Sequence, residues 1–192
     1  MTTTTTEIVP GSLGAIAARD NISVAESFLS ADVIVIVDVS GSMATHDSRG
    51  GHSRYEVACE ELRTLQARLP GKIAVVAFSG GFQFAPGGVP LFQGDTTNLA
   101  GALRFVQVAD GTVEFFVISD GEPDSPADAL AIAQRFESKI STIYVGPEGG
   151  RGSDFLRQLA AASGGQHTTA ARAVELAASI ERLMLKTGSS SS

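Results

Sequence analysis

Cysteine, tryptophan and tyrosine are scarce in this chain. Its 192 residues include one cysteine, no tryptophan and two tyrosines. Cys59 alone can form no internal disulfide, and a cysteine-rich zinc site is excluded. It follows Val57 and Ala58 in a segment of helical period, where a cysteine usually acts as a small buried hydrophobe. We therefore expect no redox role and a reducing compartment.

Basic residues and long apolar runs are scarce as well. Lysine and arginine total 14 against 21 acidic residues, which gives a net charge of -7. The resulting negative field repels phosphate backbones, so we expect no nucleic-acid partner. The longest apolar runs are too short to cross a bilayer, and the N-terminal threonine tract lacks the pattern of a secretory signal. We expect a cytoplasmic protein without a membrane span, unless it is exported by a route that the sequence does not announce.

Apolar residues make up 43% of the chain and charged residues 18%, which is typical of one globular domain. Apolar runs of strand length alternate with segments of helical period. This alternation predicts a mostly parallel sheet covered on both faces, in a doubly wound, Rossmann-like α/β fold of three layers. The run Val33–Val37 has no polar alternation, so its strand should be central. The expected strands are 32–39, 72–79, 89–92, 113–119, 140–145 and 166–168.

Several helix starts are marked by capping residues. Ser53 with Glu56, and Ser125 with Asp128, both fit a capping box, and Pro126 suits the first helical position. The stretch rich in glycine and proline after residue 79 is too short for a helical crossover, so a hairpin should place 89–92 as an antiparallel edge strand. The expected helices are 54–68, 98–106, 126–137, 154–162 and 172–185.

We expect the chain to divide into three parts. Residues 1–30 are predicted to form an N-terminal extension, partly flexible, in which Ser23 and Glu26 could cap a short helix. Residues 31–186 are predicted to form the domain, and residues 187–192 a flexible serine-rich tail.

A polar motif follows the central strand directly. Asp38, Ser40 and Ser42 form an Asp-x-Ser-x-Ser pattern, which turns one carboxylate and two hydroxyls toward the same point. In open α/β sheets, ligands bind at the carboxyl ends of the strands. The motif alone is a weak signal, because serine and aspartate also form turns by bonding their own backbone.

Two further segments bring oxygen atoms to the same edge of the predicted sheet. The first contains Thr97, which could instead be a helix cap, and the second contains Asp120. Converging on Asp38, they would give two carboxylates and three hydroxyls, a set suited to Mg²⁺ or Mn²⁺ rather than zinc. Since hydroxyls are neutral and Mg²⁺ keeps exchangeable positions, a partner's Asp or Glu could complete the site.

The segments Asp38-Val39-Ser40-Gly41-Ser42-Met43, Thr97-Asn98-Leu99 and Ser119-Asp120-Gly121 together resemble the metal-ion-dependent adhesion site of von Willebrand factor A domains. The resemblance spans roughly residues 31 to 186. It implies direct or water-mediated metal contacts from Asp38, Ser40, Ser42, Thr97 and Asp120, and a six-stranded sheet with one antiparallel edge strand. Thr96 precedes Thr97, so the hydroxyl assignment could slip by one residue.

Near the predicted site, the polar loop 45–53 is our candidate for partner specificity, with His46 and His52 expected to be solvated rather than ligands. Asp124 is expected to be a solvated carboxylate.

The function that these features favour is a metal-dependent protein-binding module, not an enzyme. The alternative is a structural subunit of a larger assembly, with contacts bridged by metal or made by the extension. A metal-dependent phosphotransferase or hydrolase using Asp38 is disfavoured, because Ser40 replaces the second aspartate that such a phosphatase needs and no phosphate-binding or hydrolase motif is present. The resemblance also suggests an adaptor role toward an AAA+ ATPase.

Overall fold

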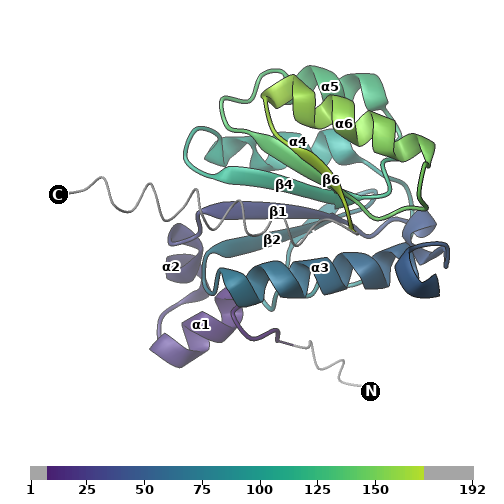
Figure 1. The fold of residues 1–192 in the computed structure, drawn as a ribbon. Coiled ribbons are helices and arrows are strands. Elements are labelled where there is room, and N and C mark those ends of the chain that lie inside the picture. Colours follow the sequence, from purple (N-terminus) through teal and green to yellow (C-terminus); the bar gives the residue numbers. More distant parts are fainter. Residues whose placement is uncertain (1–7, 171–192) are drawn as a thin grey trace.

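The computed structural model describes residues 8–170, which form a six-stranded sheet between two layers of helices (Figure 1). The strand order is β3-β2-β1-β4-β5-β6. Every neighbouring pair is parallel except β2 and β3, which are antiparallel. The predicted fold class is therefore confirmed. The strands are β1 (Val33–Asp38), β2 (Ile73–Phe78), β3 (Phe82–Phe84), β4 (Glu114–Ser119), β5 (Ile140–Tyr144) and β6 (His167–Thr169).

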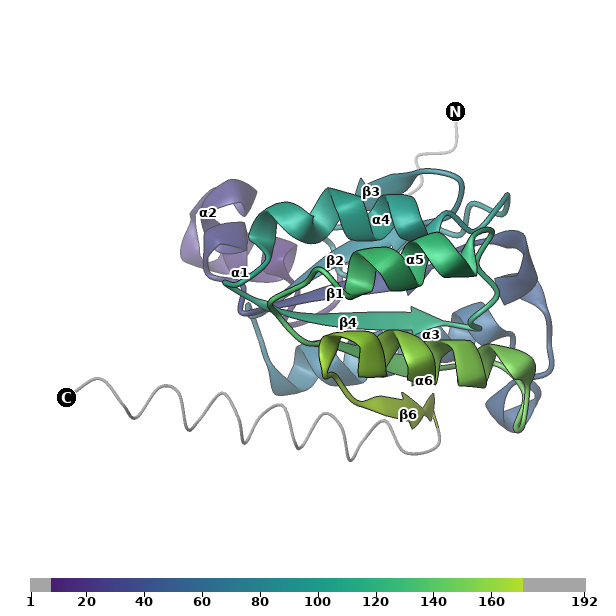
Figure 2. The same cartoon turned by 90° about the horizontal axis from the view of Figure 1, so that it is seen from above.

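Helix α3 covers one face of the sheet, and α4, α5 and α6 cover the other (Figure 1). Helices α1 and α2 precede the first strand and lie at the amino ends of the parallel strands (Figure 2). The helices are α1 (Leu13–Asp20), α2 (Val24–Leu29), α3 (Arg54–Arg68), α4 (Leu99–Val106), α5 (Pro126–Ala133) and α6 (Arg151–Ser163).

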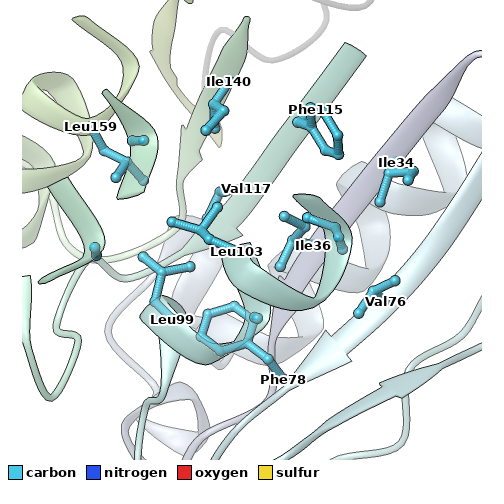
Figure 3. Close-up of a cluster of buried hydrophobic side chains, with 14 of the residues drawn as sticks. Ile34, Ile36, Val76, Phe78, Leu99, Leu103, Phe115, Val117, Ile140 and Leu159 are labelled. Atoms are coloured by element: carbon cyan, nitrogen blue, oxygen red, sulfur yellow. The ribbon is translucent and has the colours of Figure 1, made fainter. Parts of the chain in front are cut away.

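The central strand β1 is buried on both sides, as the unbroken run of branched residues predicts. Ile34 and Ile36 pack toward α4, α5 and α6 (Figure 3). Val33, Val35 and Val37 pack toward α3. Each of these side chains stabilises the fold by about 1.5–3 kcal/mol through its burial. This two-sided core fixes the end of β1, and with it Asp38, in the middle of one edge of the sheet.

The capping residues give a mixed result. The capping box of Ser53 and Glu56 is present, and so is that of Ser23 and Glu26 at the start of α2. Ser125 instead donates a hydrogen bond to the Asp128 carboxylate at 2.8 Å and makes no side-chain cap bond to the backbone.

Helix α5 also ends at Ala133, four residues before the predicted end. The backbone hydrogen bonds there join residues three apart instead of four. This tighter turn lets Phe136 pack edge-on against Phe115 at a ring-centroid distance of 5.1 Å.

The prediction of the edge strand is wrong in position. The antiparallel strand is β3, not 89–92. Gly80 and Gly81 allow a turn directly after β2, in which the Ser79 N–H donates to the Gly81 carbonyl at 2.8 Å. The chain therefore reverses sooner than the run of apolar residues suggested.

In the extension, α1 is an element that the sequence did not predict, and Ser12 caps it by accepting a hydrogen bond from the Ala15 N–H. The predicted helix 172–185 and the tail 187–192 lie outside the described residues.

Candidate functional site

Asp38 is the last residue of β1, and its side chain is buried. Its Oδ1 accepts a hydrogen bond from the Ser40 N–H at 2.9 Å, which folds the loop back over the strand end. This turn brings the Ser40 and Ser42 hydroxyl oxygens to 3.3 Å from each other. The loop after β1 thus places a carboxylate and two hydroxyls together, as the motif predicts.

The second oxygen of Asp38 is held by the neighbouring strand. Ser119 ends β4, which pairs with β1 in parallel, and its hydroxyl donates to Asp38 Oδ2 at 2.7 Å. The Ser119 Oγ accepts in turn from the Gly121 N–H at 2.9 Å. In the sequence, Ser119 is marked only as a member of the Asp120 segment, and this role is not apparent there. The parallel pairing of β1 with β4 was the signal that could have found it.

The Thr97 segment lies against the same loop. The Gly41 N–H donates to the Asp95 carbonyl at 3.1 Å, and the Gly94 N–H donates to the Val39 carbonyl at 3.0 Å. Thr97 is buried, whereas Thr96 is exposed and lies beside Gly80. This placement favours Thr97 over Thr96 as the residue that faces the site.

Thr97 is not the cap of α4, because Asn98 occupies that position and accepts from the Gly101 N–H. The expectation for Asp124 needs correction too. It is exposed, but its carboxylate accepts from the Thr97 N–H at 3.0 Å, and its own N–H donates to the Thr97 carbonyl. Asp124 therefore ties the loop after β4 to the Thr97 segment.

Asp120 is buried beside a cation that the sequence analysis did not identify. Its Oδ2 accepts from Arg54 Nη1 at 2.7 Å, and its Oδ1 accepts from the Glu122 N–H at 3.2 Å. The Arg54 guanidinium also binds Asp47 through two hydrogen bonds of 2.8 Å. No motif marks Arg54, because it is the first residue of α3 and reaches the site only through the packing of that helix.

The two carboxylates influence each other electrostatically. Burial and the negative charge of Asp120 together raise the pKa of Asp38 to about 6, against the opposing effect of the hydrogen bonds from Ser40 and Ser119. Hydrogen bonds to Asp47 and Asp120 raise the pKa of Arg54, which therefore stays charged.

The residues at this edge suit a hard divalent cation. Within residues 8–170, no three or more His, Cys, Asp or Glu side chains are grouped to hold a metal, so a site here depends on hydroxyls together with two carboxylates. Among residues 8–170, the hydrogen-bond donors to Asp38 are the neutral groups of Ser40 and Ser119, and no cation of these residues pairs with its buried charge. A divalent ion held by hydroxyl and carboxylate oxygens fits that deficit.

The loop 45–53 forms the rim beside Asp120. His46 and His52 are exposed, and His52 Nδ1 lies 3.8 Å from a Glu56 carboxylate oxygen. Asp47 is anchored by Arg54, and Arg49 donates to the Ala170 carbonyl at 2.8 Å. The loop is therefore fixed at two points while its histidines remain available to solvent.

No protein-family model matches the sequence, and no curated protein matches it. Among solved structures, the chain is similar to an aerotolerance-related membrane protein from Bacteroides fragilis, with 16% identity and a TM-score of 0.63 over 81% of this chain and 99% of that one. It is similar to a von Willebrand factor type A protein from Catenulispora acidiphila, with 20% identity and a TM-score of 0.53 over 79% of this chain and 42% of that one. A third similar structure is the manganese-loaded TRAP protein of Plasmodium vivax, with 18% identity and a TM-score of 0.52 over 69% of this chain and 63% of that one.

These similarities show that the chain has a von Willebrand factor A-like fold. Within residues 8–170, no helix has the length and apolar character needed to cross a membrane.

Proposed function

We propose that this chain is a metal-dependent binding module that captures an acidic side chain of a partner protein. Asp38, Ser40, Ser42, Thr97 and Asp120 hold Mg²⁺ or Mn²⁺, directly or through water, and the partner's carboxylate completes the coordination. The observation that carries the proposal is the environment of Asp38, a fully buried carboxylate with neutral donors on both oxygens.

The charges around the site support an acidic ligand. Asp38 and Asp120 contribute two negative charges, and Arg54 contributes one positive charge at 2.7 Å from Asp120. A divalent cation converts this net charge of about -1 into about +1, which an Asp or Glu carboxylate neutralises. Asp47 also pairs with Arg54 at 2.8 Å and is partly exposed, so it offsets part of the Arg54 charge from the solvent side.

The similarity to a manganese-loaded protein supports Mn²⁺ or Mg²⁺ as the ion. An AAA+ ATPase or an assembly subunit in the cytoplasm remains our expectation for the partner.

The alternative of a structural subunit joined through the extension has less support. Residues before β1 form contacts within the chain: the Val9 N–H donates to the Gly87 carbonyl at 2.9 Å, and the Gly71 N–H donates to the Gly11 carbonyl at 2.8 Å. Those backbone groups are not free to pair with a neighbouring molecule. Light scattering with and without Mg²⁺ distinguishes the two functions, because bridging by metal would raise the molar mass.

The metal is tested directly with Mn²⁺ and electron paramagnetic resonance. We expect the wild type to bind one Mn²⁺ and Asp38→Ala to bind none while keeping its fold by circular dichroism. Asp154→Ala is the matched control, since Asp154 pairs with Arg157 on an exposed helix face. Pull-downs with the wild type and Asp38→Ala, each with and without EDTA, then test partner capture. Partner binding that persists in excess EDTA would overturn the proposal.

A further inference from the structure

Three polar side chains meet at the β5–β6 side of the sheet: Thr142 in the middle of β5, Ser153 in the first turn of α6 and His167 at the start of β6. His167 joins them: its Nδ1 lies 2.9 Å from Thr142 Oγ1, and its Nε2 lies 3.0 Å from Ser153 Oγ. Thr142 is buried, and the other two residues are half-buried. The three side chains therefore form a hydrogen-bonded chain in which Thr142 contacts His167 and His167 contacts Ser153.

The hydrogen bonds determine which nitrogen of His167 carries the proton. The Thr142 hydroxyl donates to the Leu156 carbonyl at 3.1 Å, so its proton is already used. Thr142 must then accept from His167 Nδ1–H, which leaves Nε2 with a lone pair facing Ser153. Burial lowers the pKa of His167, which keeps the ring neutral at pH 7. In this arrangement the Ser153 hydroxyl donates to a base.

Ser153 opens onto a pocket of about 260 Å³, which Tyr144 also lines. The Tyr144 hydroxyl has no hydrogen-bond partner among residues 8–170. Glycines surround it closely, because a Cβ on Gly150 would lie 2.0 Å from this hydroxyl, and one on Gly146 would lie 2.4 Å away. The pocket therefore contains a hydroxyl that is able to donate to a bound carbonyl oxygen.

We propose that Ser153 is a nucleophile that accepts the acyl group of a small carboxylic ester in this pocket. Ser153 Oγ forms a bond to the carbonyl carbon while its proton moves to His167 Nε2. The bond between that carbon and the ester oxygen then breaks, and the departing alkoxide takes the proton from His167 and leaves as an alcohol. Ser153 remains as an ester, and His167 is neutral again.

The sequence could not indicate this site. Ser153 stands in Gly150-Arg151-Gly152-Ser153-Asp154, which lacks the Gly-x-Ser-x-Gly elbow of hydrolases. The histidine belongs to the edge strand β6, and Thr142 belongs to β5, so only the pairing of these strands brings the groups together.

A fluorophosphonate probe tests the proposal on the full chain, with peptide mapping by mass spectrometry. We expect labelling of the wild type at Ser153 and none in Ser153→Ala. His167→Gln should slow labelling by about 100-fold or more, the contribution of a general base. Thr142→Val should slow it, and Thr142→Ser should restore it. Ser163→Ala, on the same helix, should label like the wild type.

The wild-type measurement decides the question even if a variant unfolds. Labelling no greater than that of Ser153→Ala, or located on another serine, would overturn the proposal. Labelling of folded His167→Gln at the wild-type rate would overturn it as well. The wild type in excess EDTA should keep full labelling, because the serine site does not depend on the proposed metal.

Discussion

Asp38 and Asp120 are adjacent carboxylates with nearly the same burial but opposite electrostatic surroundings. Their exposed fractions are 0% and 1%. Asp38 receives hydrogen bonds from the neutral groups of Ser40 and Ser119, whereas Asp120 is paired with the guanidinium of Arg54. Burial alone therefore does not identify a cation site. The absence of a counter-charge among the described residues is what distinguishes a cation site. It points to Asp38, whose uncompensated charge suits metal binding but destabilises the metal-free fold.

Replacing each carboxylate by its amide should separate the two residues most clearly. Asp38→Asn should weaken Mg²⁺ binding by at least about 100-fold, as expected for the loss of a charged ligand. In EDTA its free energy of unfolding should equal or exceed that of the wild type, because an uncompensated buried charge is removed.

Asp120→Asn should instead lower the free energy of unfolding, because it leaves buried Arg54 without its partner. Calorimetric titration with Mg²⁺ and urea denaturation measure the two quantities. Equal losses of stability in both variants would show that the comparison is wrong.

Removing Arg54 should make Asp120 resemble Asp38. Arg54→Gln should lower the free energy of unfolding in EDTA by about 3 kcal/mol, since it breaks a buried ion pair. The same change should tighten Mg²⁺ binding, because Asp120 no longer shares its oxygen with a guanidinium.

Thermal unfolding with and without Mg²⁺ should therefore show a larger metal-dependent gain in Arg54→Gln than in the wild type. Arg49→Gln is the control, since Arg49 pairs with Glu60 and Glu61 away from the metal ligands. A gain no larger than that of the control would count against competition between Arg54 and the metal.

The charge of Asp38 should also make stability depend on pH in the absence of metal. Its pKa rises from an ordinary value of 3.8 to about 6 on folding. Between these two pH values, the folded state therefore holds a proton that the unfolded state has released. Stability from this residue therefore increases as the pH falls from about 7.5 to about 5, by about 1 kcal/mol.

Burial lowers the pKa of His167 and raises that of Glu61, so both groups also contribute to the pH dependence, and the useful quantity is the difference between the wild type and Asp38→Asn. Urea denaturation in EDTA at several pH values measures it. A difference that does not change with pH would contradict the assigned environment of Asp38.

Thr97 should show the smallest effect. Its backbone N–H bonds to Asp124, whereas its hydroxyl has no hydrogen-bond partner among residues 8–170. Thr97→Val should weaken Mg²⁺ binding by about tenfold and leave the free energy of unfolding of the metal-free protein nearly unchanged. Thr96→Val, the neighbouring control, should change neither, and a larger loss of binding in Thr96→Val would reverse the assignment.

The sequence predicted the sheet well where burial on both faces dictates composition. The unbroken apolar run Val33–Val37 predicts a central strand, as observed. The capping box of Ser53 and Glu56 predicts the start of α3 at the residue where it begins. The edge strand was misplaced because Phe82–Phe84 and residues 89–92 have similar apolar character. The turn at Gly80 and Gly81 reverses the chain directly after β2, so Phe82–Phe84 becomes the edge strand.

At the candidate site, sequence identified residues that carry their own motif but not those brought in by packing. Asp38, Ser40 and Ser42 are close in the chain, so their convergence follows from one turn. Arg54 and Ser119 reach the carboxylates through a helix and a neighbouring strand, and nothing local distinguishes them from ordinary surface or strand residues. Whether the five predicted ligands hold a metal remains a prediction.

The edge of the sheet at β3 has a further consequence. That strand has three residues, and Phe82 stacks on Phe105 of α4 at a ring-centroid distance of 4.6 Å. Just beyond it, the Gly14 N–H donates to the Pro86 carbonyl at 2.8 Å, so the extension binds the backbone that continues from this strand. A short border closed in this way offers little template for edge-to-edge aggregation. Truncating the first helix would free the Pro86 carbonyl and remove the buried Leu13 from the core, so the protein should lose stability as well as solubility.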